Sequence, residues 1–339
     1  MGGNTTGTKN IRDVARAAGV SVATASRVLA STNYPVAAAT REKVQETARA
    51  LGFVPNALAR SLARARSDSI GVVAPLLVNP YYAAMVEGID AMAREHGLCM
   101  LLSLTNSDEE RRETVIDELL ARQVDGIIVC AGAADHMPGR TPEAAGVPFV
   151  LIGQQANTGF PIITVDNRRA GYEATEYLWS LGHRRFAYLT GHAGWHDFKD
   201  REAGMLEFLR SRAEHHQARV FEDLLDEADS YRCVREAYAA GLNATALLAS
   251  TDRHALGALA ALADCGLGVP GDISVMGFDD YVTSKFVRPS LTTMRMPAGD
   301  MGRASVSKLQ HMFSSKEKAE DARFSATLIE RGSAGAAKS

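Results

Sequence analysis

Cysteine is scarce in this 339-residue sequence, and no two cysteines have the spacing of a metal-binding or redox motif. The four are Cys99, Cys130, Cys233 and Cys265. Such scattered cysteines indicate free thiols in a reducing compartment rather than a disulfide framework. The nine histidines also lack the spacing of a zinc site. We therefore expect no structural metal and no cofactor.

Long apolar runs and catalytic signatures are missing as well. No run is long enough to span a bilayer, and residues 1–9 lack the apolar core of a signal peptide. The sequence therefore predicts a cytoplasmic protein without a membrane partner. It contains no nucleophile elbow and no phosphate loop. An enzyme that uses Asp279 and Asp280, with His183 or His196 as base, is a weaker alternative.

Charge is distributed unevenly along the chain. Residues 1–66 contain ten Lys/Arg and three Asp/Glu, a balance of +7, whereas the whole chain carries −3. Residues 67–339 therefore carry −10. A basic segment joined to an acidic body is typical of a nucleic-acid-binding module. A solvated basic face with no nucleic-acid partner has the same composition, so the local pattern must decide.

Residues 10–30, NIRDVARAAGVSVATASRVLA, predict two short helices joined by a tight turn. Asn10 and Asp13 have the spacing of a capping box, and apolar residues follow on one helical face. Gly19 suits the turn, and Ser21 suits the N-cap of the second helix. This pattern predicts a helix-turn-helix unit, whose second helix enters the major groove of DNA. A purely structural helical hairpin is the alternative.

The outer face of the second helix supplies the candidate DNA contacts. Val22 and Ala23 offer apolar contact to a thymine methyl group, whereas Arg27 suits guanine or a phosphate. Thr24 and Ser26 suit phosphate oxygens. These side chains predict a helix that both positions the headpiece and reads bases.

A third helix is expected over residues 38–51, with Gly52 ending it. The segments VSVATASRVLAS and TREKVQETARALGFVPNALARSLARARSDSIGVV resemble the headpiece and hinge of the lactose/galactose repressor (LacI/GalR) family. This resemblance is nearly continuous from Ile11 to Val73. One departure is Ala37, which stands where a capping serine is common in the family; losing that cap costs on the order of 1 kcal/mol.

The resemblance implies a hinge over residues 55–66. In this family a short hinge helix, here Asn56 to Ala63, folds on the operator and wedges a leucine into the central base step. By position that leucine is Leu62. An apolar wedge unstacks and bends the duplex, and Arg60 would supply charge for the phosphates beside it. Ordinary helix packing is the alternative role for Leu62.

From residue 67 onward, apolar runs alternate with amphipathic segments. The runs expected to form strands are SIGVVAPLL, LCMLLSLT, GIIVC, FVLIG, IITVD, RFAYLTG, RVFED, ALLAS and ISVMGFDD. The helices expected between them cover residues 81–97, 108–123, 168–181, 201–211, 231–240 and 254–265. This alternation predicts an α/β body of two doubly wound parallel sheets. Ligands of such sheets bind beyond the carboxyl ends of the strands.

The resemblance extends over this part and implies a periplasmic-binding-protein-like body with two lobes. The expected ranges are 1–9 for a flexible N-terminus, 10–54 for the headpiece, 67–165 with 297–325 for lobe 1, 166–292 with 326–332 for lobe 2, and 333–339 for a flexible tail. The sequence lacks the C-terminal heptad helix with which some family members tetramerise. We therefore expect a homodimer, because a pseudo-palindromic operator needs two headpieces.

Arg201 is the first candidate for binding an effector, because it matches the family position whose guanidinium grips the ligand. A fork of donors suits paired sugar hydroxyls or a carboxylate. Trp195 lies in the same segment, LTGHAGWHDFKDREAGM, and its flat ring suits stacking on a pyranose. The alternatives are a surface ion pair of Arg201 with Glu202 or Glu207, and packing of Trp195 on its own lobe.

Other candidates follow expected strand ends or begin helices. Asp279 in GFDD and Asp166 in VDN match family positions that accept hydrogen bonds from the effector. Thr251 replaces the asparagine of a usual Asn-Asp pair, which puts the contact there in doubt. Tyr81 and Tyr82 in NPYYAAMV are expected to face the opposite lobe. The alternatives are helix capping for Asp279, packing at the lobe boundary for the tyrosines, and, for Asp252, capping of the helix that follows Thr251.

Together these features predict a sequence-specific DNA-binding transcription regulator, and a repressor in particular. Its affinity for the operator would be controlled by a small molecule, a sugar or sugar derivative, bound between the lobes. Control by a protein partner is an alternative within the same family. A solute-binding protein is a further alternative, which the basic headpiece and the missing signal peptide disfavour.

Overall fold

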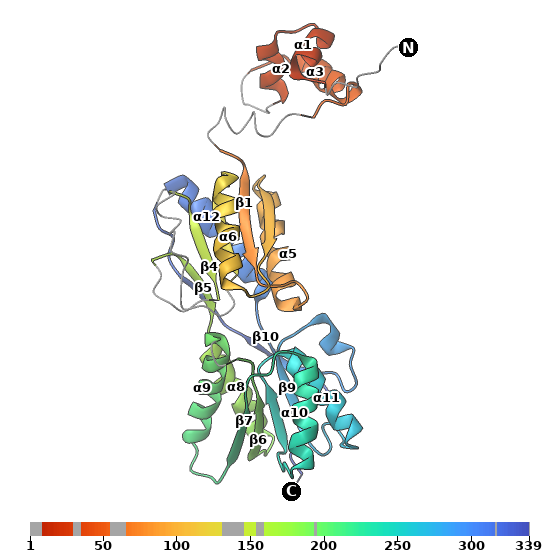
Figure 1. Ribbon diagram of the computed structural model, residues 1–339, viewed down its shortest axis with the longest axis vertical. Coiled ribbons are helices and arrows are strands. Elements are labelled where there is room, and N and C mark those ends of the chain that lie inside the picture. The colour runs from red at the N-terminus through yellow and green to blue at the C-terminus, as the bar shows by residue number, and fades with distance from the viewer. Residues whose placement is uncertain are drawn as a thin grey trace. The chain divides into compact units, whose positions relative to one another are not determined.

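The computed structural model divides the chain into two compact units, Met1–Asp68 and Ser69–Ser339 (Figure 1). The structure describes residues 9–29, 35–54, 66–130, 146–153, 159–192, 195–315 and 317–338. The expectations for Asn56, Arg60 and Leu62 therefore lie outside the described residues. Within the described part of the chain, no helix is both long enough and apolar enough to cross a membrane.

Among its described residues, the first unit has the helices α1 (Ile11–Ala18), α2 (Val22–Leu29) and α3 (Ala38–Ala50). The predicted capping box begins α1: Asn10 accepts a hydrogen bond from the N–H of Asp13, and the Asp13 carboxylate accepts one from the N–H of Asn10 at 3.1 Å. Gly19 ends this helix with φ 69°, a conformation that glycine adopts without steric strain. Ser21 caps α2 by accepting from a backbone N–H at 3.1 Å. The sequence therefore predicted both ends of the turn correctly.

Small apolar residues form the core of this unit. The buried ones are Val14, Ala15, Ala18, Ala25, Val28, Val44 and Ala48. Ala37 begins α3 without a side-chain cap, as the sequence predicted, and Gly52 follows its end with φ 62°. A core of valines and alanines buries little apolar area, so the unit by itself has a narrow margin of stability.

The second unit has two lobes, each built on a six-stranded sheet. In lobe 1 the strand order is β11-β5-β4-β3-β1-β2, and every pair is parallel. The strands of lobe 1 are β1 (Ser69–Ala74), β2 (Cys99–Leu104), β3 (Gly126–Cys130), β4 (Phe149–Ile152), β5 (Ile162–Val165) and β11 (Ala322–Phe324). Its helices are α5 (Pro80–Glu95), α6 (Glu109–Ala121) and α12 (Ala298–Ser315).

Lobe 2 repeats this plan with the order β12-β10-β9-β8-β6-β7. Its strands are β6 (Arg185–Leu189), β7 (Gln217–Phe221), β8 (Ala246–Ala249), β9 (Ser274–Asp279), β10 (Thr292–Arg295) and β12 (Thr327–Ile329). Its helices are α8 (Asn167–Ser180), α9 (His196–Arg210), α10 (Glu227–Ala239), α11 (Asp252–Asp264) and the short 3-10 helix η1 (Val282–Lys285). The edge strand β12 pairs antiparallel with β10, which is the departure from the predicted parallel sheets.

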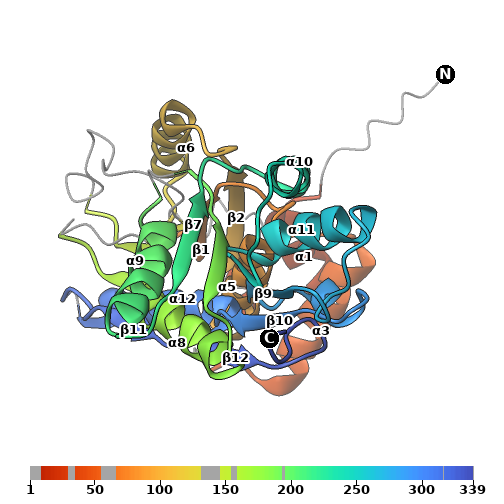
Figure 2. The ribbon, with the colours of Figure 1, turned by 90° about the horizontal axis from the view of Figure 1, so that it is seen from below.

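The chain passes between the lobes three times. It does so from β5 to α8, from β10 to α12 and from β11 to β12, with β10 lying where the lobes meet (Figure 1). In lobe 2, α8 and α9 cover one side of the sheet and α10 and α11 the other (Figure 2). The predicted fold class is confirmed: a helix-turn-helix headpiece is followed in the chain by an α/β body of two doubly wound lobes.

The C-terminal residues differ from the expected flexible tail. Ser333 is fully buried, where its hydroxyl donates to the Val275 carbonyl at 2.6 Å and accepts from the Thr292 N–H at 2.8 Å. The Ala337 N–H donates to the Leu181 carbonyl at 2.8 Å. Over residues 333–338 the expectation was wrong, because small polar residues in this stretch complete hydrogen bonds of lobe 2.

Candidate DNA-binding helix and interlobe site

Helix α2 exposes the side chains that the sequence assigned to DNA. Ala23, Ser26 and Arg27 are exposed, and 45% of Val22 is accessible to solvent. Thr24 is partly exposed, and its hydroxyl is hydrogen-bonded to the Ser21 hydroxyl at 2.9 Å. The opposite face of α2 is buried in the headpiece core. The apolar side chains of Val22 and Ala23 and the guanidinium of Arg27 therefore belong to the solvent-exposed face of α2.

Arg201 lies inside lobe 2, with only 3% of its surface exposed. Its Nε donates to Asn167 Oδ1 at 2.8 Å, and Nη1 donates to the Ser250 carbonyl. Nη1 also lies 4.0 Å from Asp279 Oδ1. The alternative of a surface ion pair with Glu207 is wrong, because Glu207 pairs instead with Arg168 at 2.7 Å.

Close contact between α8 and α9 sets the position of Arg201. Gly171 of α8 lies against the backbone carbonyl of Arg201, and a Cβ added at Gly171 would overlap that carbonyl. Gly204 of α9 lies in the same way against the carbonyl of Arg168. The two glycines let the helices approach backbone to backbone, which carries the guanidinium to the end of the sheet.

Asn167 and Asp197 belong to this cluster, and the sequence analysis missed both. Asn167 is 2% exposed and links Arg201 to Asp197. Its Oδ1 accepts a hydrogen bond from the Arg201 guanidinium, and its Nδ2 donates one to Asp197 Oδ1 at 3.0 Å. Burial raises the pKa of Asp197 to about 6, although the Arg201 charge works in the opposite direction. The predicted acceptor Asp166 is the residue before Asn167, so the signal lay one position away.

Asp279 ends β9 at the boundary between the lobes. Its φ of 111° lies in a region that residues with a side chain rarely adopt, and such strain is concentrated at functional sites. Its side chain is 4% exposed. Burial raises the pKa of its carboxyl to about 7, opposed by the nearby guanidinium of Arg201. Asp279 is thus a candidate that the structure places beside Arg201.

Tyr81 and Tyr82 come to the same place from lobe 1. They begin α5, whose N-cap Asn79 accepts a hydrogen bond from the Tyr81 N–H at 3.0 Å. Their rings meet edge to face, with centroids 5.4 Å apart. Burial raises the pKa of both hydroxyls, and the carboxylate of Asp197 across the lobe boundary is the next largest cause. Side chains of the two lobes therefore lie close enough at this boundary to act on each other electrostatically.

A hydrogen bond also crosses the lobe boundary. The Tyr281 hydroxyl of lobe 2 donates to Asn79 Oδ1 of lobe 1 at 2.7 Å. Because the same Asn79 oxygen caps α5, this contact couples the tyrosine pair to the end of β9. Neither residue was a predicted site residue, although Asn79 begins the NPYYAAMV segment, because their side chains meet only in the folded protein.

Three further candidates have structural partners. Asp166 caps α8 and pairs with Arg323 at 2.8 Å. Thr251 caps α11, and its hydroxyl lies 3.0 Å from His254 Nδ1. The ring of Trp195 packs against that of Phe198 at a tilt of 48°, with a centroid distance of 5.1 Å. These partners give each of the three residues a structural role, and their proposed contacts with an effector remain predictions.

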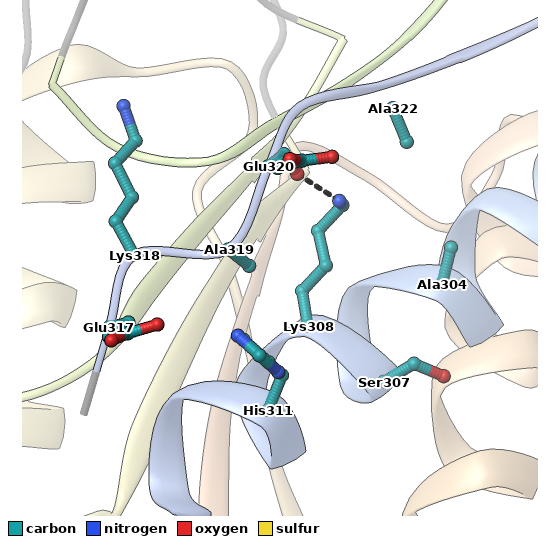
Figure 3. A pocket seen from close by; sticks show the side chains of 9 residues that line it. All are labelled: Ala304, Ser307, Lys308, His311, Glu317, Lys318, Ala319, Glu320 and Ala322. Carbon is teal, nitrogen blue, oxygen red and sulfur yellow. Dashed lines mark hydrogen bonds between the residues drawn. The ribbon is translucent and has the colours of Figure 1, made fainter. Parts of the chain in front are cut away.

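Two pockets lie apart from these residues. One, of about 660 Å³, lies between the C-terminal half of α12 and the segment before β11, where Lys308 donates to the Glu320 carbonyl (Figure 3). The other, of about 280 Å³, adjoins the outer side of α9 near Phe198 and Glu222. Neither pocket is lined by a predicted effector residue. Among the described residues, no three His, Cys, Asp or Glu are grouped to hold a metal ion.

Comparisons with known families agree with both units. The family described as "Bacterial regulatory proteins, lacI family" matches residues 10–56, and the family described as "Periplasmic binding protein-like domain" matches residues 175–334. The transcriptional regulator GalR of Escherichia coli (strain K12) is 34% identical over 301 residues, covering 85% of this chain and 84% of the relative.

Solved structures resemble the whole chain. The lac repressor dimer bound to operator and the anti-inducer ONPF has a TM-score of 0.84 at 27% identity, covering 97% of this chain and all of that one. The transcriptional regulator CelR in complex with cellobiose has a TM-score of 0.72 at 26% identity, covering 96% and 99%. These relatives are regulators rather than enzymes, in agreement with the sequence analysis.

Proposed function

Because the chain belongs to the LacI/GalR family of DNA-binding transcription regulators, we propose that it is a repressor controlled by a carbohydrate bound between its lobes. The observation that carries this proposal is the convergence of Arg201, Asp279, Tyr81 and Tyr82 from both lobes on one site. A guanidinium, carboxylates and aromatic rings are the groups that hold sugar hydroxyls and sugar faces. The related CelR, solved with cellobiose, supports the same ligand class.

The proposed regulation follows from the site's position. A ligand held by both lobes favours one relative arrangement of the lobes over others, and only such a difference in affinity shifts an equilibrium. Two copies of the chain, forming a cytoplasmic homodimer, would place two headpieces on a pseudo-palindromic operator. Whether the ligand releases or recruits the dimer depends on which arrangement binds DNA.

The headpiece and the site are tested separately. Purified full-length protein is expected to bind an operator identified by selection from random duplexes, and to change that affinity when a sugar binds. Arg27→Ala is expected to lower the preference for operator over random DNA by about tenfold or more, because a bidentate guanine contact is worth about 1–3 kcal/mol. Equal loss on both DNAs would limit Arg27 to a phosphate contact.

The variant Asp279→Ala is expected to behave in the opposite way. It should lose ligand binding in a thermal-shift screen of sugars and polyols, while its operator affinity without ligand stays within about twofold. Unchanged ligand binding would place the pocket elsewhere. An operator response that requires a second protein, and no sugar, would favour the alternative of a protein partner.

A further inference from the structure

The charges at the interlobe site do not balance. Arg201 faces two carboxylates, those of Asp197 and Asp279, from the end of lobe 2. A third buried carboxylate, Asp252, is satisfied inside the lobe by donors that include the Tyr281 N–H at 3.0 Å and the Thr293 hydroxyl at 2.6 Å. With Asp197 and Asp279 ionised, one positive charge therefore meets two negative charges beside the tyrosine rings of lobe 1.

The guanidinium is largely committed to the protein. Its Nε bonds to Asn167, its Nη1 bonds to the Ser250 carbonyl, and its charge lies nearest Asp279. The rings of Phe278 and Phe198 pack on it, with centroids 4.9 Å and 5.6 Å from its central carbon. The charge of Arg201 is thus shared by two carboxylates, Asp197 and Asp279, and a single positive charge cannot neutralise both of them and an acidic ligand as well.

Asp197 is the carboxylate without a matching cation. Its hydrogen bond within the described residues comes from the neutral amide of Asn167, at 3.0 Å. The charged and titratable groups around it are His196, Asp200 and Arg201 of its own helix, Tyr81 and Tyr82 of α5, and Asp279 of β9. A partly buried carboxylate in such a setting is stabilised by a positive donor on the ligand.

Resting on the effector site proposed above, we propose that the ligand is a sugar-sized polyol carrying a protonated amine, whose ammonium group binds Asp197. The ammonium would donate charge-assisted hydrogen bonds to Asp197, and the hydroxyls would face Asp279 and the two tyrosines. A sugar acid would bring a third negative charge against two existing ones. A neutral sugar would leave the charge of Asp197 uncompensated, so both bind more weakly.

The test uses matched ligands with the full-length protein. The probes are triads of hexose, 2-amino-2-deoxyhexose and hexuronic acid in the gluco, galacto and manno series, measured by calorimetry at pH 7.5 and pH 5.5. One amino sugar is expected to bind about tenfold or more tightly than its hexose at pH 7.5, with the uronic acid weakest. Its advantage is expected to shrink at pH 5.5, where protonation removes the charge of Asp197.

Two charge-removing variants on the same helix complete the test. Asp197→Asn is expected to reduce the ratio of the amino-sugar affinity to the hexose affinity to about twofold or less. Glu207→Gln removes the same charge from the exposed side of α9, where Glu207 pairs with Arg168, and is expected to keep the preference. Asp197→Asn is also expected to raise the melting temperature of the ligand-free protein at pH 7.5; a lower one contradicts an uncompensated charge.

Two results of the calorimetry would overturn the amine proposal. A hexose or uronic acid that binds as tightly as the amino sugar of its series overturns the proposal, as does binding by none of the three amino sugars. Measuring operator binding with the same preparation distinguishes failure of the amine proposal from failure of the proposed function. If a neutral or acidic sugar changes operator affinity, the proposed function stands without the amine, whereas a protein that ignores every operator contradicts the function itself.

Discussion

At the scale of single residues, burial and pairing act on Asp279 in opposite directions. An arginine near a carboxylate lowers its pKa, but Arg201 lies 4.0 Å away, and burial outweighs it. The pKa of Asp279 is therefore about 7 in the folded protein, well above its ordinary value of 3.8. The carboxyl of Asp279 is thus about half ionised at pH 7, and hydrogen bonds or positive charge supplied by a ligand favour its ionised form.

This balance predicts how stability depends on pH. Because the folded protein holds the Asp279 proton more tightly than the unfolded chain does, the stability that this residue contributes falls as pH rises from about 4 to about 7. Asp279→Asn removes that slope. The melting temperature of the variant, measured from pH 5 to pH 8, is expected to rise relative to wild type across the interval by several degrees. Parallel curves would show that Asp279 is ionised throughout.

At the scale of elements, the alternation of apolar and amphipathic segments was enough to predict the strands β1 to β9. It was less informative at helix starts. The sequence analysis began one helix at Arg201, whereas α9 begins at His196, because its first turn is polar and aromatic and follows a Gly-containing loop. The site residue Asp197 lies in that missed turn.

The partners within the site were beyond the reach of the sequence pattern. Asn167 lies 30 residues before Asp197 and 34 residues before Arg201 in the chain. It meets them only because α8 and α9 pack closely at their glycines. No periodicity reports such a register between two helices. Capping motifs, in contrast, are local, which explains why Asn10, Ser21 and Gly19 were predicted correctly.

The contact between α8 and α9 can be tested at Gly171. Gly171→Ala adds a Cβ that overlaps the Arg201 carbonyl, so α9 must move. We expect a loss of about 1–3 kcal/mol in the free energy of unfolding despite the better helix propensity of alanine, together with weaker ligand binding. Gly271→Ala is the matched control, because a Cβ there has ample room. Equal unfolding midpoints in urea would show that the helices accommodate the methyl group.

The C-terminal segment is a second place where amino-acid composition alone led to a wrong structural prediction. Its Ser, Gly and Ala residues are typical of a flexible tail, yet Ser333 bonds two buried backbone groups. Ser333→Ala leaves the Thr292 N–H and the Val275 carbonyl without this partner, so we expect unfolding to become easier by about 1–3 kcal/mol in urea. Ser314→Ala on the exposed end of α12 serves as control and should change little. A variant as stable as wild type would mean that the tail contributes no stability.

At the scale of the whole second unit, control by a ligand requires that the lobes have more than one arrangement. The hydrogen bond from Tyr281 to Asn79 stabilises the arrangement described here, because it joins the end of β9 in lobe 2 to the first turn of α5 in lobe 1. Removing one hydrogen bond of about 0.5–1.5 kcal/mol changes the ratio of two arrangements by roughly 2- to 13-fold. Under the proposed function, the hydroxyl of Tyr281 would therefore help to set how strongly a ligand changes operator binding.

Tyr281→Phe tests this link without a ligand. Spin labels on the exposed Cys99 of lobe 1 and Cys265 of lobe 2, diluted with unlabelled protein, report the distance between the lobes. We expect the variant to show a broader distribution with a second distance, because the described arrangement loses population. Tyr177→Phe removes a hydroxyl that bonds to Glu330 within lobe 2, so its distribution should match wild type. If the distance distribution of Tyr281→Phe also matches that of wild type, packing and the connecting segments hold the lobes in place. A ligand that changes the arrangement must then overcome those contacts rather than this hydrogen bond.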